Sequence, residues 1–298
     1  RLAHLNSGIL SESLIALGHQ PGSRTLAAVP RMAFTAALGH SLGPVHIDLT
    51  VKYPLIISNI GNGYNPATGI FTARVSGMYY FRYTMFNNLG SRSNSVMSLM
   101  KNSQRMVSTW DTSGSDDNDT ATNAAVLQLE EGDNVYTRLY ANRQIYDDGA
   151  NYNTFSGFLA KIRTPPGTPM PAWPSASPIS AYQVIISNMG NGYNPATGIF
   201  TARVSGMYYF SYTMYNNNRG STPNSEMSLM KNGQLMAYTS DIVGNDFQNS
   251  ATNAAVLRLE AGDNVYTELY ANRRIYDDGA NYNTFSGFLL FPLNLCSL

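Results

Sequence analysis

Two nearly identical segments carry the side chains best suited to chemistry in this sequence. Residues 143–152 read RQIYDDGANY, and residues 273–282 read RRIYDDGANY. Tyrosine rings can stack on sugar rings, asparagine and aspartate can hydrogen-bond hydroxyl groups, and arginine can pair with a carboxylate such as that of sialic acid. Both segments therefore indicate either a glycan-binding loop or a long hairpin loop ordered by its own hydrogen bonds. The predicted ligand-binding residues are Arg143, Tyr146, Asp147, Asp148, Asn151, Tyr152, Arg273, Tyr276, Asp277, Asp278, Asn281 and Tyr282.

These segments belong to a longer internal repeat. Residues 64–81 recur without change as residues 193–210, and residues 145–159 recur as residues 275–289. A period of about 130 residues is too long for a solenoid repeat and has the size of a whole domain. The chain of 298 residues accommodates two such domains, each able to bury a core of its own. Chemistry that is essential to the repeated unit is therefore expected in both copies.

Counting side chains argues against an enzyme. All four histidines lie within the first 50 residues, so the second copy contains none. A Ser-His-Asp site or a histidine-bound zinc site common to both copies is therefore excluded. The duplicated pair of Asp147 and Asp148 suits acid–base catalysis poorly, because adjacent residues of a strand point in opposite directions. Turn formation explains Asp-Asp-Gly better, and we expect a non-enzymatic protein.

The composition narrows the classes of partner. Lys+Arg and Asp+Glu both number 19, so the formal net charge is zero and nothing indicates nucleic-acid binding. No apolar run approaches the roughly 18 residues of a membrane span, so none is expected. Cys296 is the single cysteine and could form only an intermolecular disulfide. The start at Arg1 is compatible with a removed leader, and the sequon at Asn118 is compatible with secretion.

The hydrophobic pattern divides the chain into four parts. Apolar residues of the first part recur at near-helical spacing, which indicates a short surface helix or the end of a coiled-coil stalk. From about Met32 onward, short runs of strand-forming residues alternate with turn residues, which predicts an all-β sandwich of the jelly-roll type. A proline-rich stretch between the copies predicts an extended linker. The predicted parts are an N-terminal segment at 1–30, a first domain at 31–163, a linker at 164–171 and a second domain at 172–298.

Three spaced motifs carry a resemblance to a known family. They are Gly77-x-Tyr79-Tyr80-Phe81, Gly132-Asp133-x-Val135 and Tyr152-x-Thr154-Phe155-Ser156-Gly157-Phe158-Leu159, and the second copy repeats them. These residues resemble the globular head of complement C1q and its relatives, the C1q-domain family. The resemblance implies two tandem ten-stranded jelly rolls like that of tumour necrosis factor, which usually assemble as trimers. It also implies that most of the aromatic residues are core or subunit interface, and this is expected of Phe71, Phe81, Phe155 and Phe158.

The resemblance suggests a calcium site as well. Some family members bind calcium through loop aspartates, and by position in the repeat the candidates here are Asp111, Asp119 and Asp241. In the second copy Asp241 matches Asp111, but Asn249 stands at the position that corresponds to Asp119. The first copy therefore has the more acidic set. The alternative interpretation is a solvated acidic loop. The segments 108–120 and 238–250 also diverge between the copies, so if they bind ligands, the two domains have different partners.

The resulting hypothesis is a secreted recognition protein. Collagen-free members of the family suggest lectin activity or pattern recognition in innate immunity, with a glycan or a microbial surface as the partner. The resemblance implies a homotrimer, with two stacked trimer rings, in which multivalency would strengthen individually weak binding. No cofactor is expected apart from the calcium candidate. The rival hypothesis is a structural matrix or assembly protein whose domains only trimerise and cross-link, with Cys296 as a covalent tie.

Overall fold

The computed structural model describes residues 31–87, 94–112, 119–160, 182–217, 225–241 and 249–293. The predictions for residues 1–30, for the linker at 164–171, for Asn118 and for Cys296 lie outside these ranges. Residues 31–298 form one compact unit. The described ranges consist of strands, turns and irregular segments, and no helix within them could cross a membrane. We call residues 31–160 module 1 and residues 182–293 module 2.

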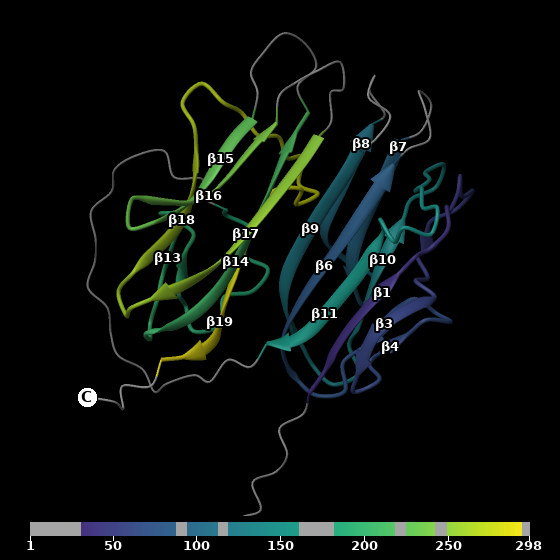
Figure 1. Cartoon of the computed structure of the whole chain (residues 1–298), viewed down its shortest axis with the longest axis horizontal. Coiled ribbons are helices and arrows are strands. Elements are labelled where there is room, and N and C mark those ends of the chain that lie inside the picture. The colour runs from purple at the N-terminus through teal and green to yellow at the C-terminus, as the bar shows by residue number, and fades with distance from the viewer. Residues whose placement is uncertain are drawn as a thin grey trace, which may run out of the picture. The chain divides into compact units, whose positions relative to one another are not determined.

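Module 1 is a ten-stranded jelly roll with one additional short strand, and all its strand pairs are antiparallel (Figure 1). The first sheet has the order β3 (Leu55–Ile60), β1 (Ala33–Ala37), β11 (Thr154–Ala160), β6 (Gly77–Asn87) and β9 (Asp119–Leu129). The second sheet has the order β4 (Tyr64–Asn65), β5 (Ile70–Thr72), β10 (Asn134–Leu139), β7 (Asn94–Lys101) and β8 (Gln104–Thr112), and β2 (Leu49–Thr50) also pairs with β10. The predicted fold class is therefore confirmed.

Module 2 repeats this topology in its described residues. One sheet has the order β12 (Tyr193–Asn194), β13 (Ile199–Thr201), β18 (Asn264–Leu269), β15 (Ser225–Lys231) and β16 (Gln234–Asp241). The other has the order β17 (Asn249–Leu259), β14 (Gly206–Asn216) and β19 (Thr284–Pro292). Residues 184–189, which correspond to β3, form no strand here.

A cavity of about 850 Å³ lies beside β19 in module 2, and its lining includes Phe285 and Gly287. In module 1 the equivalent of Gly287 is Gly157, which pairs with Phe34 of β1. The cavity therefore lies where module 1 has its first strand. Because a strand of the same chain fills this place in module 1, we do not assign the cavity to a ligand.

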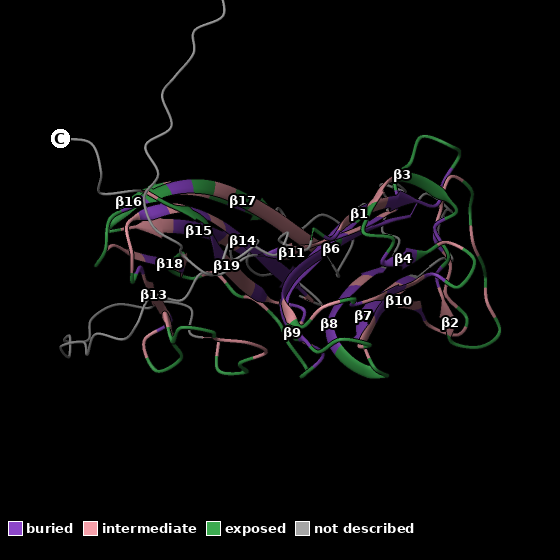
Figure 2. Cartoon of the chain, turned by 90° about the horizontal axis from the view of Figure 1, so that it is seen from below, coloured by how far each residue is buried: buried purple, intermediate pink, exposed green. Residues whose placement is uncertain are grey.

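Aromatic side chains form the core of module 1. Residues that alternate along β6 point to the same side, so Phe81 faces inward together with rings from β1, β5 and β11. The Phe34 and Phe155 rings meet edge to face at 4.9 Å, and the Phe71 and Phe81 rings do so at 5.3 Å. All four are fully buried, whereas β3 exposes most of its residues (Figure 2). Burial of such rings is the largest source of stability available to a sheet sandwich.

A second apolar cluster joins the two modules. It contains Met78, Tyr80, Ala124, Val126 and Ala160 of module 1 together with Phe288 of module 2, and Phe158 packs against it. The Tyr80 and Tyr209 hydroxyls lie 3.0 Å apart, and their rings meet edge to face at 5.2 Å. Tyr209 is the repeat equivalent of Tyr80. Phe158 thus lies between modules, whereas Phe71, Phe81 and Phe155 lie in the core of one.

Gly157 gives the first stability prediction. A Cβ atom at this position would lie 2.4 Å from Cδ1 of Phe81 and 2.9 Å from Cε1 of Phe34. Both rings are locked in the core, so Gly157→Ala should destabilise the protein by about 1–3 kcal/mol. Thermal unfolding measures this loss. Gly233→Ala is the control, because a Cβ atom at this position would have no atom within 4 Å. This variant should lose stability only through the positive φ of 81°. An unchanged unfolding temperature in Gly157→Ala would contradict the packing described here.

Candidate functional site

The predicted ligand-binding segment of module 1 is the loop between β10 and β11, and the buried carboxylate of Asp147 shapes it. Oδ1 of Asp147 accepts hydrogen bonds from the backbone N–H groups of Gly149 (3.0 Å) and Asn151 (3.1 Å). Oδ2 accepts one from the N–H of Asn153 (3.2 Å). Asp147 is 3% exposed. Its side chain therefore organises the loop from within and is directed away from solvent.

Asn153 fixes the same loop to the sheet. Its side-chain amide donates to the carbonyl of Tyr146 at 2.6 Å, and its Oδ1 accepts from the N–H of Phe86 in β6 at 2.9 Å. Ser41 adds a further contact, since its hydroxyl donates to the carbonyl of Asp147. The loop conformation is thus determined by its own sequence and by its contacts with neighbouring strands.

Module 2 builds the loop in the same way. Asp277 accepts from the N–H groups of Gly279 (3.0 Å) and Asn281 (3.1 Å), and Asn283 donates its amide to the carbonyl of Tyr276 at 2.7 Å. The hydrogen-bond-ordered hairpin loop, one of the two interpretations of this segment, therefore describes its local structure. The binding interpretation is compatible with it and stays a prediction.

The inner half of the loop, residues 151–152 and 281–282, differs sharply in burial between the modules. The Tyr152 ring packs on Phe86 at 4.4 Å, and the Tyr282 ring packs on Tyr215 at the same distance. Tyr152 is 41% exposed, but Tyr282 is only 4% exposed. Trp110 of module 1 packs over Tyr282 at 6.3 Å, which accounts for the difference. In module 2 the inner half of the loop is therefore an interface between modules.

The outer half of the loop, residues 143–148 and 273–278, keeps accessible side chains in both modules, although Ile145 and Asp147 are buried in module 1. Tyr276 is 36% exposed although Tyr282 is covered, and Asp148 and Asp278 are exposed. Desolvation and the nearby carboxylate of Asp148 raise the pKa of Tyr146 above its ordinary value of 10.0. The hydroxyl of Tyr146 therefore stays protonated at neutral pH and can donate a hydrogen bond.

The two arginines of the outer half have different surroundings. The guanidinium of Arg273 forms an ion pair with Oε1 of Glu226 at 2.8 Å. Val96 occupies the position of Glu226 in module 1, so Arg143 has no counterpart of this carboxylate. Both arginines are half-buried. An ion pair inside the protein competes with an external anion, so Arg143 is the better prepared of the two to meet a ligand carboxylate.

The calcium candidates lie near the ends of three strands. Asp111 is in β8 and is 2% exposed, while Asp119 begins β9 and Asp241 ends β16. Burial raises the pKa of Tyr215 in module 2, and the charge of Asp111 adds to this increase. Among the residues that the structure describes, no group of three or more His, Cys, Asp or Glu side chains is positioned to hold a metal ion. The calcium site stays a prediction.

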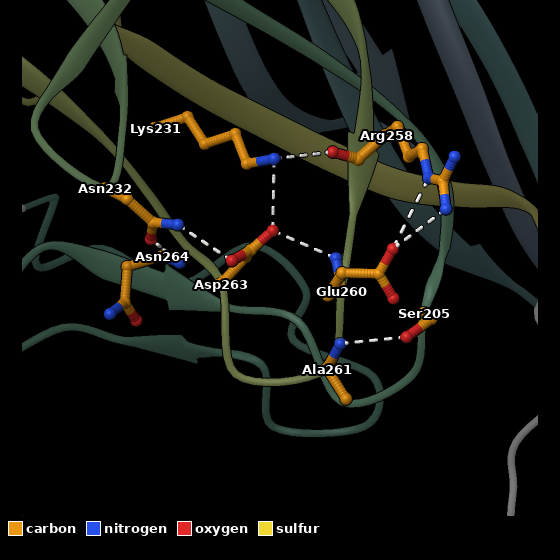
Figure 3. A network of polar contacts seen from close by, with 8 residues as sticks. All are labelled: Ser205, Lys231, Asn232, Arg258, Glu260, Ala261, Asp263 and Asn264. Atoms are coloured by element: carbon orange, nitrogen blue, oxygen red, sulfur yellow. Dashed lines mark hydrogen bonds and ion pairs between the residues drawn. The ribbon is translucent and has the colours of Figure 1, made fainter.

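A polar network at the turn before β18 shows the structural role of the Gly-Asp motif (Figure 3). Oδ2 of Asp263 lies 3.1 Å from Nζ of Lys231 and accepts from the N–H of Glu260 at 2.9 Å, and the Asn232 amide donates to Oδ1 at 2.7 Å. In module 1, Asp133 forms the same contacts with Lys101 (3.0 Å) and Asn102 (2.6 Å). The motif therefore joins two hairpin turns.

Comparison with known proteins gives this architecture a family. The C1q domain profile matches residues 33–160 and again residues 168–290. The chain belongs to the C1q-domain family and contains the domain twice. Membership indicates a recognition or assembly protein of the C1q and tumour necrosis factor type, and such domains are generally non-enzymatic and typically extracellular.

Individual relatives share one domain with this chain. Caprin-2 of Danio rerio is 36% identical over 129 residues, which are 43% of this chain and 14% of the length of Caprin-2. The globular domain of zebrafish complement 1qA is 22% identical with a TM-score of 0.37, and covers 44% of this chain and 99% of that domain. Murine APRIL is 13% identical with a TM-score of 0.35, and covers 43% of this chain and 98% of its own. Each of these solved structures covers less than half of this chain.

Asp147 gives the second prediction. Asp147→Asn replaces a charged acceptor of backbone N–H groups by an amide that can satisfy fewer of them, so we expect a loss of about 1–3 kcal/mol in unfolding free energy. Hydrogen exchange should become faster at the Gly149 and Asn151 amides. Asp148→Asn is the matched control, because Asp148 is exposed and its Oδ1 accepts from Ala150 alone among backbone amides of the described chain. Equal effects of both substitutions would contradict the organising role of Asp147.

Asp133 gives a pH prediction. The N–H of Glu130, the amide of Asn102 and the charge of Lys101 hold the pKa of Asp133 below its ordinary value of 3.8. A depressed carboxyl pKa stabilises the folded state above the unfolded pKa, and this contribution is lost as the pH falls through the folded pKa. The pair is partly solvated, so the gain should be below about 1 kcal/mol. Asp133→Asn should lower stability at pH 7 and flatten its acid dependence in urea titrations; a variant that follows the original curve would contradict this.

Proposed function

We propose that this chain is a secreted, non-enzymatic recognition protein whose outer loop halves bind acidic glycans, such as those on microbial surfaces. The proposal rests on the outer half of the loop at 143–152 and its copy at 273–282. These residues combine a guanidinium group, a tyrosine ring and a carboxylate on a loop whose backbone is already ordered by Asp147 and Asp277. Ordering before binding reduces the entropy that a ligand would otherwise have to offset.

Persistent exposure is the observation that carries the proposal. Contact between the modules covers Tyr282 but leaves Tyr276 and Asp278 accessible. A surface that stays open on a module already engaged by another module is available for an external ligand. Two such surfaces in one chain also provide two binding sites of related chemistry.

The difference between the arginines supports a specific role for module 1. Arg143 would pair with the carboxylate of an acidic sugar, Tyr146 would stack on its ring, and Asp148 would accept from its hydroxyls. Arg273 is engaged by Glu226 at 2.8 Å, so module 2 would bind neutral glycans or bind acidic ones more weakly. The modules would then have related but unequal specificities.

Multivalency would raise the overall affinity for a ligand surface above the weak affinity of each single site. C1q-type domains commonly form trimers, and a homotrimer of this chain, with two stacked rings, would present six outer loops. Calcium near Asp111 and Asp119 would be an accessory to this assembly and not a reactant. The same assembly would allow recognition of a repetitive surface that a single site would not retain.

The proposal predicts an asymmetric response to arginine substitution. Arg143→Ala should weaken binding to sialylated glycans about tenfold or more, because charge-assisted hydrogen bonds contribute about 1.5–3 kcal/mol. Arg273→Ala is the matched control and should change binding little, since its guanidinium is already paired. The measurement is binding to immobilised sialylated and neutral glycans, with and without calcium. Absence of binding to every glycan, or equal losses in both variants, would contradict the proposal.

A structural role in an extracellular matrix is the second candidate. The extensive contact between the modules favours it, because the same contact could cross-link chains without any glycan. Large polymers formed in the absence of ligand, together with no binding on the glycan surface, would support this candidate over recognition.

A further inference from the structure

An arginine of module 1 lies against the predicted ligand-binding loop of module 2. Arg105, near the start of β8, is exposed, and its guanidinium donates to the carbonyl of Gly279 at 3.4 Å. Gly279 directly follows Asp278, the last residue of the outer half of this loop. The contact between the modules therefore places a cation of one module beside the loop of the other.

Most of the guanidinium of Arg105 remains available for a ligand. Arginine has five N–H donors, and the hydrogen bond to Gly279 is the one that the described residues show for this side chain. None of the ion pairs between described residues involves Arg105. A guanidinium that is held by a carbonyl and not by a carboxylate can still bind an external anion in the forked geometry of arginine.

The loop's own first arginine is already paired. Arg273 is engaged by Glu226 at 2.8 Å, whereas Arg143 of module 1 has no counterpart of this carboxylate. Arg105 thus brings to the module 2 loop the unpaired guanidinium that Arg143 provides in module 1. The two loops then have the same set of chemical groups, although the cation has a different origin in each.

The charge of Arg105 also acts on the inner half of the loop. Burial and the charge of Asp278 raise the pKa of the Tyr282 hydroxyl, and the positive charge of Arg105 opposes this increase. The potential around the loop therefore contains a contribution from Arg105 that attracts anions and partly offsets the repulsion by Asp278.

A row of aromatic rings extends from this loop into module 1. The centroids of the Tyr276 and Tyr215 rings are 6.1 Å apart, and those of Tyr215 and Tyr282 are 4.4 Å apart. Trp110 of module 1 continues the row, with its ring 6.3 Å from that of Tyr282. Tyr276 is 36% exposed and Trp110 is half-buried, so both ends of the row keep accessible ring surface. Ring faces beside a guanidinium are suited to a sugar that carries an acidic group.

The cation and the last ring of the row belong to module 1 alone. The repeat equivalents of Arg105 and Trp110 in module 2 are Leu235 and Ser240. Leucine supplies no charge and serine supplies no ring. The combination of Arg105 and Trp110 with this loop is therefore a property of the contact between the modules and not of the repeated unit.

We propose that Arg105 completes an acidic-glycan site on the module 2 loop, where it pairs with the carboxylate of the sugar while Tyr276 contacts the ring and Asp278 accepts from a hydroxyl group. This inference rests on the proposed function of the outer loop halves and adds the residue that gives module 2 its preference for an acidic ligand. Binding stays weaker than in module 1, because Asp277 is exposed beside Asp278 and adds a second negative charge. The site exists only where the two modules are joined.

A titration with sialyllactose tests this site, with the fluorescence of Trp110 as the readout. The background carries Trp173→Phe, which leaves Trp110 as the single tryptophan, and Arg143→Ala, which removes the cation of the module 1 site. Sialyllactose should change the emission of Trp110 saturably, and lactose, which lacks the carboxylate, should bind more weakly. Arg105→Leu, which introduces the residue of module 2, should raise the Kd for sialyllactose about tenfold or more, because a charge-assisted hydrogen bond is lost.

Arg203→Leu is the matched control. Arg203 is also exposed and also donates to a loop carbonyl, that of Asn191 at 2.7 Å, but it lies outside β8 and outside the predicted ligand-binding loop. It should leave the Kd for sialyllactose unchanged. Without ligand, the emission of Trp110 should be the same in Arg105→Leu and Arg203→Leu, which shows that the contact between the modules is intact in both.

The outcomes separate this inference from the proposed function. If the wild-type chain binds immobilised sialylated glycans but Arg105→Leu leaves the Kd for sialyllactose unchanged, the composite site is wrong and recognition through Arg143 stands. Emission of Trp110 that does not respond to sialyllactose, or a loss of binding in Arg274→Gln without a loss in Arg105→Leu, would also overturn the composite site. A wild-type chain that binds no sialylated glycan would overturn both proposals.

Discussion

The buried amide of Asn123 is the contact on which the arrangement of the two modules depends. Within module 1 its amide donates to the carbonyl of Ser108 and its Oδ1 accepts from the N–H of Ala124, and module 2 supplies the further partners of the buried side chain. Only the backbone carbonyls of Asn281 and Tyr282, presented together with the Thr284 hydroxyl, satisfy it among the described residues of module 2. These hydrogen bonds identify the surface of module 2 that meets module 1, and apolar packing around Tyr80 and Phe288 adds stability.

The repeated loop sequence, at residues 143–152 and 273–282, thus has two environments in the same chain. Tyr152 and Tyr282 stand on loops of the same conformation, yet one is open and the other is covered by Trp110. The covered copy shows that the inner half of the loop is suited to protein contact. Asp148 in module 1 and Tyr276 and Asp278 in module 2 stay exposed on the outer half, so recognition and assembly can occupy adjacent parts of one loop without excluding each other.

The sequence was sufficient for the fold class, because the repeat, the strand patterns and the aromatic motifs all depend on local spacing. It also indicated that Phe71, Phe81 and Phe155 lie inside, which the structure confirms. It could not show the contact between modules, since Asn123 and Asn253 stand in the same local sequence, TNAAVL, and only tertiary packing distinguishes them. The divergence of Ser108 and Trp110 from Tyr238 and Ser240 was a usable signal. This divergence predicts different partners only if these segments bind ligands, whereas the structure places Ser108 and Trp110 at the module contact.

Fluorescence of Trp110 tests the contact between Trp110 of module 1 and Tyr282 of module 2 most directly. The sequence has two tryptophans, so a Trp173→Phe background isolates the signal of Trp110. If Tyr282 packs against Trp110 within the chain, Tyr282→Ala should shift the emission of Trp110 to longer wavelength, while Tyr152→Ala, the same change on the open loop, should leave it unchanged at a concentration where single chains prevail. Equal shifts in both variants, or no shift in either, would contradict the contact described here.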